Sequence, residues 1–334
     1  MGGKAIKIAQ RIERKNFFKY TKDIIPRVES AFNTKVKMVK GFHDKKDFGD
    51  LDLLVLADRD FGNRRKIIES EFNPKEININ SHLISFSYKG DDEYLQVDLI
   101  FTPEHNWETS KVFFDWGDLG NLIGKTLNNY GRLNNHGYSL KFGFDGIKCK
   151  LKYKSGSKNI ILSKDNTSIF GFMGIDYNQW KRGFNNREEM FDYIINSKYY
   201  DYDSFQWENL SSINKQRNKK RPNYQEFLNY IDSNNYKKTI KWKSVDYHLD
   251  YIKNYFGVDI KKEMESFQKE IDNTKIIKDK FNGKLVMSVF PELQGIELGN
   301  NMRKFKELHN DWRSYALSSN NIIEDFKKWY IGNK

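Results

Sequence analysis

The chain has 334 residues and a formal net charge of +12 at pH 7, because 57 Lys and Arg residues outnumber 45 Asp and Glu residues. This length supports two domains with separate cores, and the charge favours a polyanionic partner, although an A+T-rich genome would also enrich lysine. The single cysteine excludes an internal disulfide and a thiolate zinc site, and the lack of a signal-like or membrane-spanning apolar run predicts a cytoplasmic protein without a membrane partner.

The first hundred residues read as alternating helices and strands. Residues 4–33 have helical apolar spacing, and Pro26 is expected to start or interrupt a second helix. A further helix is predicted over residues 61–71. The expected strands are residues 35–39, 51–57, 82–88 and 94–101. The order helix, strand, strand, helix, strand, strand predicts a mixed sheet with helices on one face.

The remaining chain is predicted to be mainly helical. A helix over residues 108–130 is expected to break at residues 116–118, and residues 147–153 and 159–162 form a hairpin around the sequence SGS. The later helices expected are residues 187–198, 223–232, 244–256, 259–280 and 299–330. The basic run KQRNKKRP at residues 215–222 reads as a loop.

Three acidic residues lie within apolar strands. The sequence FGDLDLLV at residues 48–55 contains Asp50 and Asp52, and QVDLI at residues 96–100 contains Asp98. Strand side chains alternate between faces, so Asp50 and Asp52 point the same way, about 7 Å apart. They repel each other unless a cation lies between them, and Mg²⁺, with Mn²⁺ as a substitute, suits carboxylates and phosphates. The pattern predicts metal-assisted phosphoryl or nucleotidyl transfer; the alternative is three solvated carboxylates in salt bridges.

Residues 35–180 resemble the palm of family X DNA polymerases, which are polymerase β-like nucleotidyltransferases. The likeness lies in a strand, a glycine, a basic loop and Asp-x-Asp, followed by VDLIFTPEHNW from residue 97 and SIFGFMGIDY at residues 168–177. Two motifs differ, since the usual Gly-Ser is Gly41-Phe42 and the usual Thr-Gly-Ser turn is Trp116-Gly117-Asp118. The family's amino-terminal lyase module has no counterpart, and residues 281–307 are faintly similar to a tail segment of transfer-RNA nucleotidyltransferases.

This resemblance implies an α+β fold class, with a nucleotidyltransferase palm of mixed sheet and flanking helices followed by a mainly helical carboxy-terminal domain. The palm would comprise residues 1–183, with a thumb-like hairpin region at residues 145–180. Residues 184–334 would form a helical nucleic-acid-binding domain.

The resemblance also assigns roles to individual residues. Asp50 and Asp52 would bind both metals, and Asp98 would bind the catalytic metal and accept the proton of the attacking hydroxyl. The residues implied in nucleotide binding are Gly41, Phe42, Lys45, Gly49, Trp116, Gly117, Asn121 and Lys125. Each has a plain structural alternative as a turn glycine, a core aromatic or an exposed polar residue. Asp115 and Asp118 have no evident role beside a phosphate site.

Basic residues in the second half are candidates for contact with nucleic-acid phosphates. Those expected to bind are Lys215, Arg217, Lys219, Lys220 and Arg221 of the basic run, together with Arg303 and Lys304. The last two follow a helix amino terminus expected at Gly299, which could seat a phosphate. A solvated loop and ordinary helix capping are the alternatives.

Together these patterns predict an enzyme that moves a nucleoside monophosphate from an NTP or dNTP to a nucleic-acid 3′-hydroxyl, in the manner of family X polymerases. One alternative is a terminal transferase acting on transfer RNA or other RNA. Another is a toxin-like enzyme that modifies a protein hydroxyl. The non-enzymatic alternative is a nucleic-acid-binding protein on a retired palm.

Overall fold

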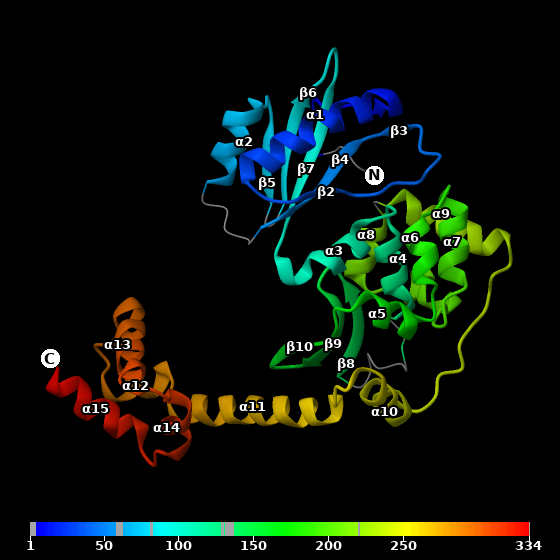
Figure 1. Ribbon diagram of the computed structural model, residues 1–334. Coiled ribbons are helices and arrows are strands. Elements are labelled where there is room, and N and C mark those ends of the chain that lie inside the picture. The colour runs from blue at the N-terminus through cyan, green and yellow to red at the C-terminus, as the bar shows by residue number, and fades with distance from the viewer. Residues whose placement is uncertain are drawn as a thin grey trace. The chain divides into compact units, whose positions relative to one another are not determined.

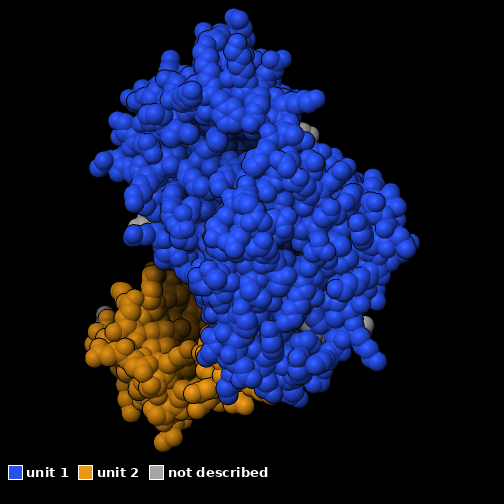
Figure 2. All heavy atoms as spheres, turned by 45° about the vertical axis from the view of Figure 1, so that its right-hand side comes forward, with its two compact units in different colours: residues 1–152, 159–258 blue, residues 153–158, 259–334 orange. Residues whose placement is uncertain are grey.

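The computed structural model describes residues 5–57, 63–80, 83–127, 130, 137–219 and 221–333 (Figure 1). Residues 61, 62 and 82, at the ends of two expected elements, lie outside the described residues. The chain divides into two compact units, one of residues 1–152 and 159–258 and one of residues 153–158 and 259–334 (Figure 2). The division expected between residues 183 and 184 stays a prediction.

The first unit contains the mixed sheet that the sequence predicts. Its strand order is β2-β4-β7-β6-β5, in which β4 and β7 run parallel and the other neighbours run antiparallel. The strands are β2 (Val36–Met38), β4 (Asp50–Leu56), β7 (Tyr94–Thr102), β6 (Leu83–Lys89) and β5 (Ile77–Asn80). The sequence analysis did not predict β5, in which only Ile77 and Ile79 are apolar.

Two helices, α1 (Arg14–Phe32) and α2 (Arg64–Phe72), cover one face of this sheet (Figure 1). Alternate residues of β4, Leu51, Leu53 and Val55, are fully buried in the core against them. Because strand side chains alternate, the intervening Asp50 and Asp52 point to the opposite face. The apolar pattern that forms this core therefore also directs the acidic residues away from it.

The expectation that Pro26 starts or interrupts a helix is wrong, because α1 continues through it. Proline removes one backbone hydrogen bond from a helix interior. Pro26 is exposed, so solvent can satisfy the carbonyl that loses its partner, while Ile24 and Val28 on either side are fully buried. Their burial against the sheet compensates for the missing bond.

A short strand pair holds the loop that leads to the acidic strand. In it β1 (Ile12–Glu13) pairs antiparallel with β3 (Asp47–Phe48), so that Ile12 lies opposite Phe48. From the sequence, residues 12–13 were expected in a helix and residues 47–48 in the basic loop before the Asp-x-Asp motif. The pairing is a tertiary contact that two residues of local sequence do not signal.

The rest of the first unit is mostly helical and has one small antiparallel sheet. The helix expected over residues 108–130 breaks after residue 114, which divides it into α3 and α4. The predicted hairpin is confirmed as β9 and β10, and β8, which was not predicted, pairs with β9. The elements are η1 (Glu104–Asn106), α3 (Trp107–Phe114), α4 (Leu119–Thr126), β8 (Tyr138–Gly143), β9 (Gly146–Tyr153), β10 (Gly156–Ser163), α5 (Asn166–Met173), α6 (Tyr177–Arg182), α7 (Arg187–Ile195), η3 (Tyr202–Ser204), η4 (Trp207–Asn209), α8 (Ser212–Lys219), α9 (Pro222–Ser233) and α10 (Val245–Phe256).

The basic run was expected to be a loop, and the structure corrects this. Residues up to Lys219 belong to α8, and Asn218 of this helix is fully buried. Pro222 then starts α9 at its first position, which proline favours because the missing N–H has no partner there. Packing of α8 on α9 supplies a buried side that the polar sequence does not reveal.

The second unit is a small bundle around the buried residues Phe281, Val286, Leu293, Phe305 and Phe326. Its helices are α11 (Ile260–Lys280), α12 (Gly283–Val289), α13 (Gly295–Glu307), α14 (Trp312–Ser318) and α15 (Ile322–Gly332). The expected helix over residues 299–330 is therefore three helices. Since α13 begins at Gly295, the prediction of a helix amino terminus at Gly299 is wrong.

Candidate metal and nucleotide site

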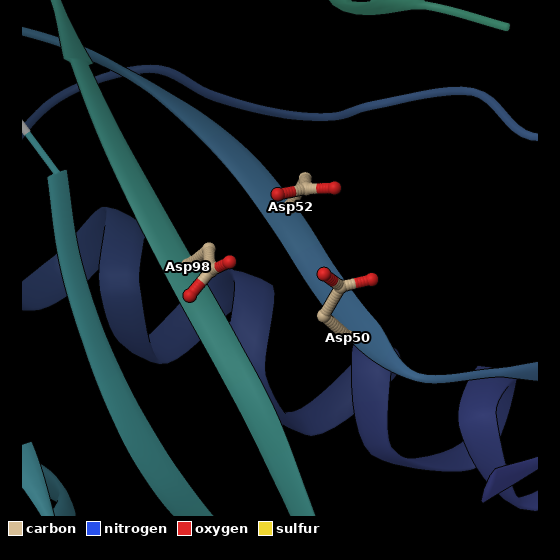
Figure 3. Close-up of side chains that lie close together, drawn as sticks. All are labelled: Asp50, Asp52 and Asp98. Carbon is tan, nitrogen blue, oxygen red and sulfur yellow. The ribbon is translucent and has the colours of Figure 1, made fainter. Parts of the chain in front are cut away.

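The three predicted carboxylates converge on one face of the mixed sheet. Asp52 of β4 lies directly opposite Asp98 of the parallel neighbour β7, and Asp50 lies one alternation earlier on β4. Each side chain offers an oxygen, and these oxygens all lie within 4.8 Å of one another. Figure 3 shows the three side chains pointing toward the same space, on the side of the strands away from α1. One divalent cation could therefore bind all three.

Burial and the repulsion between neighbouring carboxylates raise the pKa of two of these acids. Asp98 is 6% exposed; burial raises its pKa to about 6, and the charge of Asp50 adds to the shift. The Gln96 side-chain amide donates to both Asp98 carboxylate oxygens at 3.0 Å, which opposes the shift. Burial, with the charges of Asp50 and Asp98, also raises the pKa of Asp52 well above its usual value. A bound cation would offset the repulsion between the carboxylates. The oxygen donor set therefore fits Mg²⁺ or Mn²⁺.

Lys45 is the predicted phosphate-binding residue that the structure brings to the carboxylates. Burial lowers its pKa, and the charges of Asp50 and Asp52 oppose that shift. Its ammonium lies 4.4 Å from the centre of the Phe48 ring. The backbone carbonyl of Lys45 accepts a bond of 2.9 Å from the Arg14 guanidinium, which ties the loop to α1. The loop thus holds one cation beside Asp50 and Asp52.

A cavity of about 1390 Å³ opens over this region. Six of the eight predicted nucleotide-binding residues line it, together with two of the acids: Gly41, Phe42, Lys45, Gly49, Trp116, Gly117, Asp50 and Asp52. Sequence reasoning missed Arg182 and Arg187, which line the same cavity from around α6 and α7 and belong to no recognised motif. The volume is sufficient for a nucleoside triphosphate.

Trp116 is a packing residue at the edge of the cavity. It is 2% exposed, and its indole N–H donates to the carbonyl of Trp180 at 3.0 Å. A Cβ added at Gly183 would lie 2.2 Å from the indole ring, so glycine is required there. Gly117 has a φ of +67° and faces Phe42, whose ring a Cβ would meet at 3.7 Å. Little of the indole is therefore exposed for a base to stack on, whereas Gly117 and Phe42 border open space.

The structure explains the two acidic residues that flank Trp116. Asp115 is fully buried, accepts a 2.7 Å bond from the Lys37 ammonium and accepts a 2.9 Å bond from the Lys40 backbone N–H. Asp118 forms an ion pair with Arg221. Both carboxylates are therefore neutralised by partners within the protein. Neither adds an unpaired negative charge to Asp50, Asp52 and Asp98.

Asn121 and Lys125 share one face of α4 but do not line the cavity. The side-chain amide nitrogen of Asn121 is buried and has no hydrogen-bond partner in the described part of the chain. Lys125 is 4% exposed. Their predicted contact with a nucleotide stays a prediction.

The predicted nucleic-acid contacts lie in both units. Lys215, Arg217 and Lys219 are on α8, and Arg221 precedes α9. Lys220 lies outside the described residues. The remaining two, Arg303 and Lys304, are exposed on α13 of the second unit.

Comparisons with known proteins assign no family to this chain, so a functional assignment depends on the geometry of the site. Neither family models nor curated protein sequences give a match to this chain. Within the described residues, no helix combines the length and apolarity needed to cross a membrane.

Proposed function

We propose that this protein is a divalent-metal-dependent nucleotidyltransferase with a polymerase β-like palm, which transfers a nucleoside monophosphate from an NTP or dNTP to a nucleic-acid 3′-hydroxyl. The single observation that supports this most is the convergence of Asp50, Asp52 and Asp98 within 4.8 Å. Their position beside a large cavity with a nearby lysine adds to it. Three carboxylates this close together, of which Asp98 is buried, are costly to a fold without a bound cation.

In this proposal each group of residues has a separate role. Asp50, Asp52 and Asp98 would hold Mg²⁺ or Mn²⁺, which supplies Lewis acidity toward the hydroxyl and the triphosphate. Lys45 would bind a phosphate oxygen as a point charge. Asp98 would accept the proton of the attacking hydroxyl. Gly117 and Phe42 would border the sugar and base.

The acceptor is the least constrained part of the proposal. The net charge of +12 favours a nucleic acid over a protein hydroxyl. Transfer to transfer RNA, transfer to protein and a retired binding palm are treated as outcomes of the test. Retention of all three acids favours an active enzyme over the retired palm.

A screen of nucleotides and acceptors tests the proposal. The protein is incubated with each labelled NTP or dNTP, with Mg²⁺ or Mn²⁺, and with single-stranded DNA, primed DNA, transfer RNA or no acceptor. Incorporation into nucleic acid is expected, and Asp52→Ala or Asp98→Ala should reduce it at least ~100-fold. Asp91→Asn is the control, because Asp91 is exposed and pairs with Lys19 on the surface.

The possible results separate the alternatives. Full activity in both alanine variants would refute the metal assignment. Label on protein alone would identify a protein-modifying enzyme, and label on transfer RNA alone a terminal transferase. If calorimetry detects no Mg²⁺-dependent nucleotide binding, the retired palm is correct.

A further inference from the structure

Lys125 on α4 is a largely buried lysine. It is 4% exposed. Its closest recorded partner is the ring of Tyr224, whose centre lies 4.9 Å from the ammonium nitrogen. A cation–π contact replaces only part of the hydration that a buried ammonium loses. The position is therefore costly unless an anion completes it.

The charged groups around Lys125 increase this cost. Burial, together with the positive charges of Arg217, Arg221 and Lys141, lowers the pKa of Lys125 to about 8. Arg217 lies on α8, Arg221 directly precedes α9, and Lys141 lies on β8. Arg217 and Lys141 also have pKa values lowered by burial and by neighbouring cations. We call Lys125, Lys141, Arg217 and Arg221 the basic cluster, in which Lys125 is buried and Arg217 is exposed.

One carboxylate connects the basic cluster to the cavity. Asp118 pairs with Arg221, raises the pKa of Arg217 and lines the cavity that Asp50 and Asp52 also line. The cluster therefore adjoins this cavity. Asp118 occupies an arginine donor that a phosphate would otherwise use.

We propose that the basic cluster is a phosphate-binding site, which holds a backbone phosphodiester of the nucleic-acid acceptor strand. That the strand is an acceptor depends on the proposed function, whereas the phosphate site does not. Lys45 already offers a cation for the triphosphate beside the acids, which leaves this second site for the other substrate. Lys215 and Lys219 continue the positive charge along α8, where a polymer could contact several cations and a single nucleotide could not.

Three substitutions test the site by binding of a fluorescent single-stranded oligonucleotide to the full chain, measured in EDTA and without nucleotide. Lys125→Met keeps the length of the side chain and removes the charge, so affinity should fall about 10-fold and the slope against salt by about 1. Arg217→Gln should also weaken binding. Asp118→Asn should strengthen it, because the strand no longer competes with that carboxylate for Arg221. Lys22→Met, which changes an exposed lysine on α1 outside the proposed site, is the matched control and should have less than ~3-fold effect.

The outcomes decide the proposal independently of catalysis. Weaker binding in Lys125→Met and Arg217→Gln with tighter binding in Asp118→Asn would support it, even in a protein that shows no transfer activity. Unchanged affinity in all three, or an effect no larger than that of Lys22→Met, would overturn it. A parallel titration with a nucleoside triphosphate and with inorganic phosphate separates the sources. If Lys125→Met weakens triphosphate binding and leaves the oligonucleotide unaffected, the assignment to a strand is refuted. Arg217 is exposed, so its variant still tests the site if Lys125→Met does not fold.

Discussion

Replacing Asp98 by asparagine should stabilise the metal-free protein and abolish metal binding. The pKa of Asp98 is raised from 3.8 to about 6 by burial. One pKa unit corresponds to about 1.4 kcal/mol, so ionised Asp98 costs about 3 kcal/mol of folding free energy at pH 7. An asparagine carries no charge to desolvate, and its oxygen still accepts a bond from the Gln96 amide. We therefore expect the free energy of unfolding to rise by up to about 3 kcal/mol.

The pH dependence follows from the direction of this shift. Because the folded-state pKa is raised, the stabilisation by protonated Asp98 is complete below pH 3.8 and is lost as the pH rises through about 6. Urea unfolding in EDTA should show wild-type stability falling from about pH 4 to pH 7, with a smaller fall in the asparagine variant.

The control for this experiment is Asp91→Asn, whose carboxylate is 62% exposed and should change stability by less than ~0.5 kcal/mol. Added Mg²⁺ should stabilise the wild type alone, because only it keeps three acidic ligands. An Asp98→Asn variant that is less stable than the wild type at pH 7 in EDTA would refute the reasoning.

Three further experiments test the packing of the two units. Gly183→Ala should destabilise the first unit by more than ~2 kcal/mol, because φ is +95° and the new Cβ would overlap Trp116; an unchanged urea midpoint would contradict this contact. Lys280→Met should cost the second unit about 1–3 kcal/mol by removing bonds to three backbone carbonyls at the end of α14, whereas the exposed Lys278→Met should be neutral in the same unfolding assay. Burial raises the pKa of Cys149 to about 12, so a thiol reagent at about pH 8 should react with the unfolded protein only; rapid labelling of the native chain would disprove that burial.

Local sequence was sufficient for the strands that carry the acidic residues and for the direction of those side chains. Period-two alternation predicted that Asp50 and Asp52 share a face, and the burial of Leu51 and Leu53 on the other face agrees with that prediction. The order of helices and strands predicted a mixed sheet, which the strand pairing confirms. Both rest on backbone periodicity, which acts over a few neighbouring residues.

Contacts distant in sequence decided the rest. Only the parallel pairing of β4 with β7 places Asp98 opposite Asp52, and only the fold joins Asp118 to Arg221, 103 residues later. The burial of Lys125 is also tertiary, because an amphipathic helix does not specify which helices will cover it. Periodicity thus determined the orientation of side chains on each element, whereas the free energy of packing between elements determined which charges meet and which lose their water.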